Sequence, residues 1–238
     1  MENATYASLT RQSGLMSELR SIANNIANAS TTGYRAEGVI FSEHVTRLGR
    51  NHASLSMPLA QGRDTSFEQG GLSRTGGTFD LAIEGEGFFL VQTPEGERLS
   101  RNGHFTPNEN GDLVTADGYP VLDAGGAPVF VPQGVTGVAI ASDGTISADG
   151  QPIGQIGLYL PEDPNGLVRE DGVRFRADAG VGPAPLAHLV QGFLEQSNVN
   201  PILEVSRMIE VQRAYELGQS FLDLEDQRIR NMIRDIHR

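Results

Sequence analysis

Apolar residues recur at helical spacing near the start of the chain. Four of them are three or four positions apart, so they share one stripe of an α-helix. These residues are Leu15, Leu19, Ile22 and Ile26. A seven-residue spacing also runs through Leu9, Met16 and Ala23. The pattern predicts a helix over about residues 3–28, which would be roughly 40 Å long.

A longer heptad pattern occupies residues 197–238. Asn200 is of a type favoured at N-caps, and Pro201 stands at the first helical position, where a missing N–H costs no hydrogen bond. The repeat then runs through Met208, Tyr215, Leu222, Ile229 and Ile236, joined by Val211 and Met232. Because helix stability in proteins comes mostly from packing, each apolar stripe must be covered. The pattern leaves two solutions open: the terminal helices pack on each other, or both fold back onto the middle of the chain.

The middle of the chain alternates apolar and polar residues. Phe79, Leu81 and Ile83 stand at period two, which is typical of a half-buried strand. Asn-Gly and Asp-Gly pairs such as Asn102-Gly103 and Asp149-Gly150 favour the type I′ turns that close tight hairpins. We therefore expect an antiparallel β-rich domain over residues 78–196, between an N-terminal helix in residues 1–30 and a C-terminal helix in residues 197–238. Residues 41–77 show no clear period, and residues 31–77 are expected to run as an extended connector. The fold class is therefore α+β.

The net charge of -12 lies in the middle of the chain. Residues 61–197 hold 7 arginines against 19 acidic residues, whereas both ends are nearly neutral. This balance argues against nucleic-acid binding, which needs clustered cations. Cysteine and lysine are absent, which excludes thiolate zinc sites, cysteine nucleophiles, P-loops and Schiff-base chemistry. No segment has the roughly 20 apolar residues of a membrane span, and the first 30 residues do not read as a cleaved signal peptide.

Candidate chemistry is sparse. The five histidines are scattered without metal-ligand spacing. Glu84 and Glu86 share a glycine-rich bend, whereas the carboxylates of glycosidases usually face each other from separate elements. The residues around Gly111 match a calcium loop poorly, and a hairpin turn explains them better. We therefore expect no catalytic residue, no metal site and no cofactor.

Three segments resemble one protein family. "SIANNIANASTTGYRAEG", residues 21–38, is similar to the N-terminal signature of the bacterial flagellar axial proteins, the family of rod, hook and hook-associated subunits. "GGTFDLAIEGEGFFLVQTPEGERLSRNGHFTPNENGDLVTADGYPVL", residues 76–122, resembles the central motif of that family. "SNVNPILEVSRMIEVQRAYELGQSF", residues 197–221, resembles its C-terminal signature, and the three occur in the family's order.

The resemblance implies a structural subunit rather than an enzyme. In this family the two terminal helices pair in a coiled-coil-like inner domain, and the β-rich middle forms an outer domain. The implied protein is a subunit of the basal-body rod, the drive shaft that crosses the periplasm and transmits torque. Its implied partners are copies of itself, other rod subunits and the flagellar type III export apparatus, which would export it without a cleaved signal peptide.

Several alternatives stay open at this point. Within the family the segments look most like those of proximal-rod subunits, and a distal-rod or other axial subunit is the nearest alternative. From other classes, a periplasmic wall-degrading enzyme would suit a rod builder, although no carboxylate pair is convincingly placed. A soluble binding protein with helical arms also fits the apolar pattern.

The residues expected to pack between helices or subunits come from both ends of the chain. They are Leu9, Met16, Leu19, Ala23, Asn24, Asn25, Ile26, Asn28, Gly33, Tyr34, Met208, Val211, Tyr215, Leu222, Ile229, Met232 and Ile236. Our hypothesis is that the amides of Asn24, Asn25 and Asn28 bond backbone groups across subunits and specify register, as a buried amide does in a coiled coil. A simple cap on the helix end explains Asn28 equally well. Gly33 and Tyr34 would then turn the chain toward the outer domain.

Overall fold

The computed structural model describes residues 2–46, 55–135 and 137–236. The chain forms two compact units. The first comprises Met1–Ala27, Ala36–Ser66 and Asn200–Arg238, and the second comprises Asn28–Arg35 and Phe67–Val199. Each unit therefore contains segments that are far apart in the sequence.

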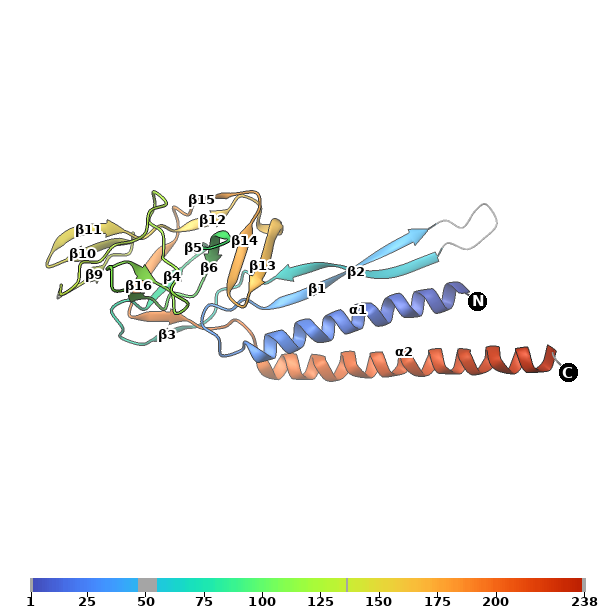
Figure 1. The fold of residues 1–238 in the computed structure, drawn as a ribbon. Helices are drawn as coiled ribbons and strands as arrows, with labels where there is room; N and C mark the ends of the chain where they lie inside the picture. Colours follow the sequence, from blue (N-terminus) through green and yellow to red (C-terminus); the bar gives the residue numbers. More distant parts are fainter. Residues whose placement is uncertain (1, 47–54, 136, 237–238) are drawn as a thin grey trace. The chain divides into compact units, whose positions relative to one another are not determined.

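The first unit consists of two long helices and a β-hairpin. Helix α1 spans Glu2–Ala27 and helix α2 spans Pro201–Ile236, and Figure 1 shows them side by side. The predicted start of the second helix is confirmed, because Asn200 Oδ1 accepts hydrogen bonds from the backbone N–H of Ile202 at 3.1 Å and of Leu203 at 3.3 Å. None of the helices in the described part of the chain combines the length and apolar character needed to cross a membrane.

The connector differs from its expected form. Strands β1 (Glu37–Thr46) and β2 (Leu55–Thr65) pair antiparallel, so this part of residues 31–77 is a hairpin. Pairing satisfies backbone groups that an unpaired extended chain would leave to water. The register shifts between Ile40 and Phe41. A bulge of this kind interrupts the alternation of side chains along a strand, which explains why the sequence shows no period here.

The second unit is built from short antiparallel strands. A four-stranded sheet has the order β13 (Leu167–Asp171), β14 (Arg174–Ala177), β6 (Gly96–Ser100) and β5 (Phe89–Thr93). A three-stranded sheet joins β11 (Gln151–Gln155), β10 (Thr145–Ala148) and β9 (Ala139–Ile140). Pairs are formed by β3 (Leu72–Arg74) with β17 (Phe193–Glu195), β4 (Leu81–Glu84) with β16 (His188–Gln191), β7 (Thr106–Pro107) with β8 (Leu113–Val114), and β12 (Tyr159–Pro161) with β15 (Val181–Pro183). One short 3₁₀ turn, η1 (Pro164–Gly166), precedes β13. The predicted antiparallel β region between two helices is thus confirmed.

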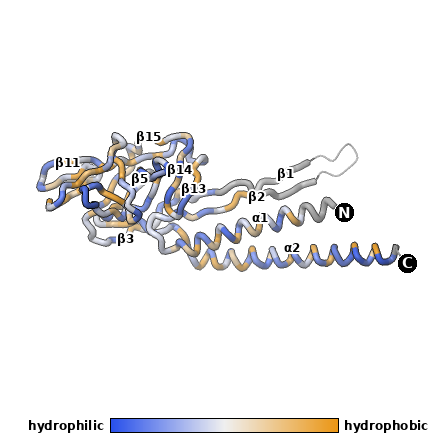
Figure 2. The backbone as a smooth tube through the Cα atoms, viewed as in Figure 1, coloured by the Kyte–Doolittle hydropathy of each residue, from blue (hydrophilic) through white to orange (hydrophobic). Residues whose placement is uncertain are grey.

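Two apolar clusters form the core of the second unit, and strand β5 separates them. Phe89 and Val91 belong to the larger cluster, whereas Phe88 and Leu90 belong to the smaller one. Successive residues of a strand point to opposite faces, so β5 is buried on both. The alternation in the sequence predicts that Ala82 in β4 is exposed. Instead Ala82 is fully buried, as are Leu81 and Ile83 on either side of it. Figure 2 shows hydrophobic stretches on the strands of this unit and along α2.

The glycines in the turn signals have two different roles. At Asp149-Gly150 both residues have positive φ, 50° and 80°, as the predicted type I′ turn between β10 and β11 requires. At Asn102-Gly103 the prediction of such a turn is wrong, since neither residue has positive φ. A Cβ atom on Gly103 would instead lie 1.7 Å from the carbonyl oxygen of Leu81. This glycine is needed for the close approach of two backbones.

We expect Gly103→Ala to destabilise the protein strongly. The new methyl group would clash with backbone atoms, and only a shift of the strand could remove the clash. Overpacking of this kind costs about 1–3 kcal/mol or more. Gly154→Ala is the matched control, because a Cβ there meets no described heavy atom within 4 Å. Denaturant unfolding of the full chain measures both variants, and equal free energies of unfolding would contradict the interpretation.

Candidate subunit interface on the terminal helices

Helices α1 and α2 pack on each other through a small apolar cluster. Its buried members are Leu15, Ile22 and Val211. Around these lie the partly buried residues Leu19, Ile26, Met208, Ala214 and Tyr215. Of the predicted packing residues, Leu19, Ile26, Met208, Val211 and Tyr215 are therefore brought together in one place. The helix-on-helix contact of the first alternative is therefore present.

Polar contacts flank this cluster, and the sequence pattern did not reveal them. Gln12 Nε2 donates a hydrogen bond to the backbone carbonyl of Tyr215 at 2.9 Å. Glu18 Oε1 accepts from Arg207 Nε at 3.0 Å and from Arg207 Nη2 at 2.8 Å. Glycine lowers helix stability, yet Gly218 interrupts the heptad of α2. A Cβ there would lie 2.4 Å from Gln12 Nε2, so the glycine makes room for the amide. In the sequence, the break in the heptad at Gly218 is the one signal of the contact between Gln12 and α2.

Many apolar side chains of α2 are exposed in the single chain. Leu217 is 73% exposed, and Ile202 is 79% exposed. We use "apolar surface of α2" for Ile202, Leu203, Val205, Ile209, Leu217, Phe221, Leu224, Ile229, Met232 and Ile233, all of which are exposed. Single exposed apolar residues are ordinary, but many on one element mark an interaction site. A groove of about 340 Å³ runs beside them between the helices, lined in part by Leu15, Leu217 and Phe221.

The remaining predicted packing residues of the helices are mostly exposed. Leu9 and Met16 are exposed on α1, as are Ala23 and Asn24. On α2, Ile229 and Met232 belong to the apolar surface, Leu222 is half-buried, and the side chain of Ile236 lies outside the described residues.

Asn25 has a contact within the chain. Its side-chain amide donates from Nδ2 to the carbonyl of Glu37 at 2.8 Å, and its Oδ1 accepts from the Glu37 N–H at 2.9 Å. Ser21 Oγ donates to the same carbonyl at 2.8 Å. The amide thus completes a pair of backbone hydrogen bonds where β1 begins, and it does so while only 1% exposed. Asn28 follows α1, and its carbonyl accepts from the Thr31 N–H at 3.0 Å.

Gly33 and Tyr34 lie in the second unit. Gly33 has a φ of 70°, and its N–H donates to the carbonyl of Glu195 at 2.8 Å. Tyr34 is buried, and the guanidinium carbon of Arg169 lies 4.6 Å from the centre of its ring. Both residues therefore anchor the segment after α1 within the β-rich unit.

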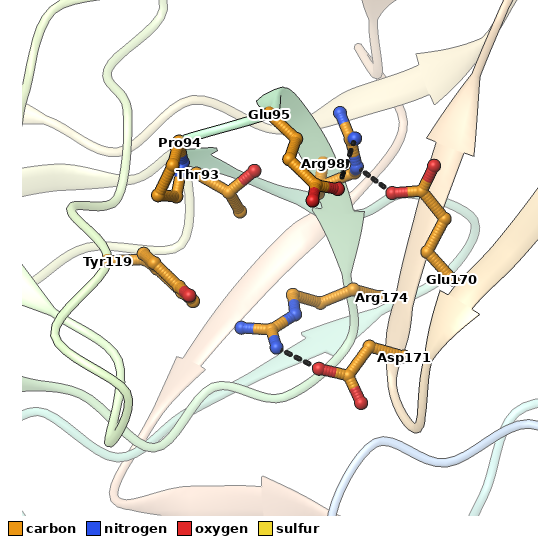
Figure 3. Close-up of a pocket in the computed structure, with 8 residues that line it drawn as sticks. All are labelled: Thr93, Pro94, Glu95, Arg98, Tyr119, Glu170, Asp171 and Arg174. Carbon is orange, nitrogen blue, oxygen red and sulfur yellow. Dashed lines mark hydrogen bonds and ion pairs between the residues drawn. The ribbon is translucent and has the colours of Figure 1, made fainter.

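A polar cavity of about 310 Å³ lies in the second unit (Figure 3). Its arginines are matched by carboxylates: Arg98 pairs with Glu170, and Arg174 pairs with Asp171. Burial lowers the pKa of Arg174, but the carboxylates of Asp171 and Asp117 outweigh this effect and raise it. The guanidinium of Arg174 also lies over the ring of Tyr119, at 4.8 Å. The cavity therefore holds compensated ion pairs, with no nucleophile beside a base among its lining residues. No group of three or more His, Asp or Glu side chains within the described residues could hold a metal ion.

Comparison with known proteins gives matches over most of the chain. The family model "Flagella basal body rod protein" matches residues 9–35, "Flagellar hook protein FlgE/F/G D1 domain" matches residues 82–148, and "Flagellar basal body rod FlgEFG protein C-terminal" matches residues 190–234. The flagellar basal-body rod protein FlgF of Caulobacter vibrioides is 39% identical over 228 residues, which cover 94% of this chain and 93% of that protein. FlgF of Mesorhizobium japonicum is 40% identical, with 91% and 90% covered, and FlgG of Bacillus subtilis is 30% identical, with 98% of each chain covered.

These matches and the uncovered helices define an axial structural protein of the bacterial flagellum. The chain belongs to the flagellar basal-body rod protein family. It is more similar to the two FlgF proteins named above than to the FlgG protein. The resemblance carried by the three sequence segments is confirmed.

We expect Asn25→Ala to weaken the attachment of β1 to α1. The buried N–H of Glu37 would lose its acceptor, and leaving a buried polar group unsatisfied costs about 1–3 kcal/mol. Hydrogen exchange at the Glu37 amide should accelerate by about tenfold or more. Asn24→Ala, which changes an exposed residue one position away, should leave that rate close to wild type. Equal rates in both variants would contradict the assignment.

Proposed function

We propose that this chain is a structural subunit of the flagellar basal-body rod, in its proximal part, and not an enzyme. The observation that carries the proposal is the apolar surface of α2, which a single chain leaves exposed. Membership of the rod family and the FlgF relatives support the same assignment. The distal-rod role is the second candidate, favoured by the FlgG relative that matches nearly the whole chain.

In the assembled rod, the terminal helices form a coiled-coil-like inner domain, and the β-rich region forms the outer domain. Copies and other rod subunits contact the apolar surface of α2. Such a contact joins different patches on successive subunits, and an interface that is not closed by rotation generates an open helical filament. The stack crosses the periplasm as a drive shaft, in which torque passes through subunit contacts, so dense packing with a fixed register gives it stiffness. The flagellar type III export apparatus delivers the subunit.

Paired substitutions on α2 test the assembly role. Leu217→Gln together with Leu224→Gln should reduce incorporation into purified basal bodies about 30-fold, because losses of about 1 kcal/mol at each of two interface residues add to about 2 kcal/mol. Both side chains are exposed in the single chain, so the free energy of unfolding should change little. Glu216→Gln together with Asp223→Asn is the control on the same helix. Normal motility and normal incorporation of the leucine variant would refute the proposed interface.

The register hypothesis is tested separately at Asn24. Asn24→Ala should reduce the number of complete rods seen after detergent extraction, while the purified subunit remains folded. The physical reason is that an amide buried between subunits specifies register, at some cost in stability. Asn25→Ala is unsuitable for this test, because that amide already bonds Glu37 within the chain. Wild-type rods in the Asn24 variant would remove this residue from the hypothesis.

A further inference from the structure

A second, smaller cavity in the β-rich unit combines buried arginines with an apolar wall. Its volume is about 170 Å³. The residues that matter here are Arg35, Arg101, Phe67, Phe88, Leu160 and Pro161. Arg35 is 1% exposed and Arg101 is 3% exposed, whereas Phe67 is 41% exposed. The cavity shares no lining residue with the polar cavity of Figure 3.

One buried carboxylate serves both arginines. Glu195 Oε1 lies 2.9 Å from Arg35 Nη2, and Glu195 Oε2 lies 3.5 Å from Arg101 Nη1. The same Oε1 atom also accepts the N–H of Gly70 at 3.0 Å. Glu195 Oε2 accepts no hydrogen bond among the described residues, and two guanidinium groups share this single negative charge.

In each guanidinium the Nε–H group is unpaired within the described part of the chain. Arg101 gives its terminal nitrogens to the carbonyls of Ile83 at 3.3 Å and Gly85 at 2.6 Å, and Arg35 Nη1 bonds the carbonyl of Glu68. The Nε–H groups of Arg35 and Arg101 have no hydrogen-bond partner among the described residues, although both atoms are buried. Buried donors are nearly always satisfied in native proteins, so two orphaned donors beside one cavity call for a ligand.

The charge balance points the same way. Burial of an uncompensated charge is costly, and the usual remedy is an ion of opposite sign. Burial lowers the pKa of Arg101 to about 10; the carboxylate of Glu195 opposes this shift, and the neighbouring Arg35 adds to it. Glu86 lines the same cavity with an exposed side chain, and its carboxylate also raises the pKa of Arg101, though less than Glu195 does. An anion in the cavity would balance the second positive charge.

We propose that this cavity binds a carboxylate carried on an apolar stem, and that the natural ligand is an acidic side chain of a neighbouring copy. The identity of the source rests on the proposed rod function. The aromatic rings of Phe67 and Phe88 suit the methylene stem of such a side chain, and the arginines suit its carboxylate. Residues 61–197 of each copy carry 19 acidic residues against 7 arginines, so a cationic cavity complements the surface that a neighbour would present.

The first experiment measures binding on the isolated full chain. N-acetyl-glutamate N-methylamide is titrated into the ¹⁵N-labelled protein, and NMR signals of the Gly87 amide and the Arg101 Nε–H are followed. We expect saturable shifts with the glutamate compound, and shifts at least about tenfold smaller with the matched glutamine compound, because only the former carries an anion. Unmoved signals, or equal shifts with both compounds, would overturn the proposal. This readout does not depend on rod assembly.

Variants locate the binding and keep the test valid if one fails to fold. Arg101→Gln should abolish the saturable shift of Gly87. Phe67→Ser changes a partly exposed wall residue and should weaken binding by about tenfold without disturbing the buried ion cluster. Arg176→Gln removes an exposed arginine that does not line the cavity, so it should bind as wild type does. Loss of binding in Arg176→Gln, or full binding in both cavity variants, would contradict the site.

The second experiment identifies the source of the carboxylate. If a neighbouring copy provides it, Arg101→Gln and Phe67→Ser should each lower incorporation into basal bodies, whereas Arg176→Gln should not. Normal incorporation of cavity variants that no longer bind the glutamate compound would overturn the subunit ligand and leave a small carboxylate as the occupant. If the α2 variants assemble normally and the cavity variants do not, the result counts against the proposed rod interface on α2. It does not count against the cavity.

Discussion

Two long helices carry more apolar surface than one chain can cover, and the character of this protein depends on that constraint. Helix α2 has 36 residues and α1 has 26, so about 15 Å of α2 has no counterpart of equal length. Their shared cluster has only three buried members, Leu15, Ile22 and Val211. Helices are stabilised mainly by covering an apolar face. The single chain is therefore incomplete in a physical sense, and further chains are the natural cover.

Directional contacts add what apolar burial cannot supply. Hydrophobic association is non-directional and does not by itself choose between registers one turn apart. The hydrogen bond from Gln12 to Tyr215, in the space left by Gly218, and the ion pair between Glu18 and Arg207 hold α1 at one position along α2. These contacts lie within one chain, so each copy offers a defined pair of helices to its neighbours.

In the β-rich unit, segments from the two ends of the β region contact each other. Gly33 and Arg35 precede most of the strands, and Glu195 follows nearly all of them, yet their backbones and side chains bond directly. Buried ion pairs are weak sources of stability, and an apolar substitute is often no worse. The main effect of the Arg35, Arg101 and Glu195 cluster is to specify which segments contact each other. Its unequal charge also creates the cationic cavity.

The sequence by itself determined the parts that depend on local chemistry. Heptad spacing, the Asn200-Pro201 start and the Asp149-Gly150 turn predicted the helices, the antiparallel middle and one hairpin, because caps, periods and turns are properties of short segments. Three segments also carried the family. Only the tertiary structure decided which apolar residues of α2 are covered, that Asn25 completes β1, that Gly103 permits a close approach, and that Arg35 and Arg101 share Glu195. Those facts join residues that are often more than 50 positions apart, and nothing in a local pattern records the distance between them in space.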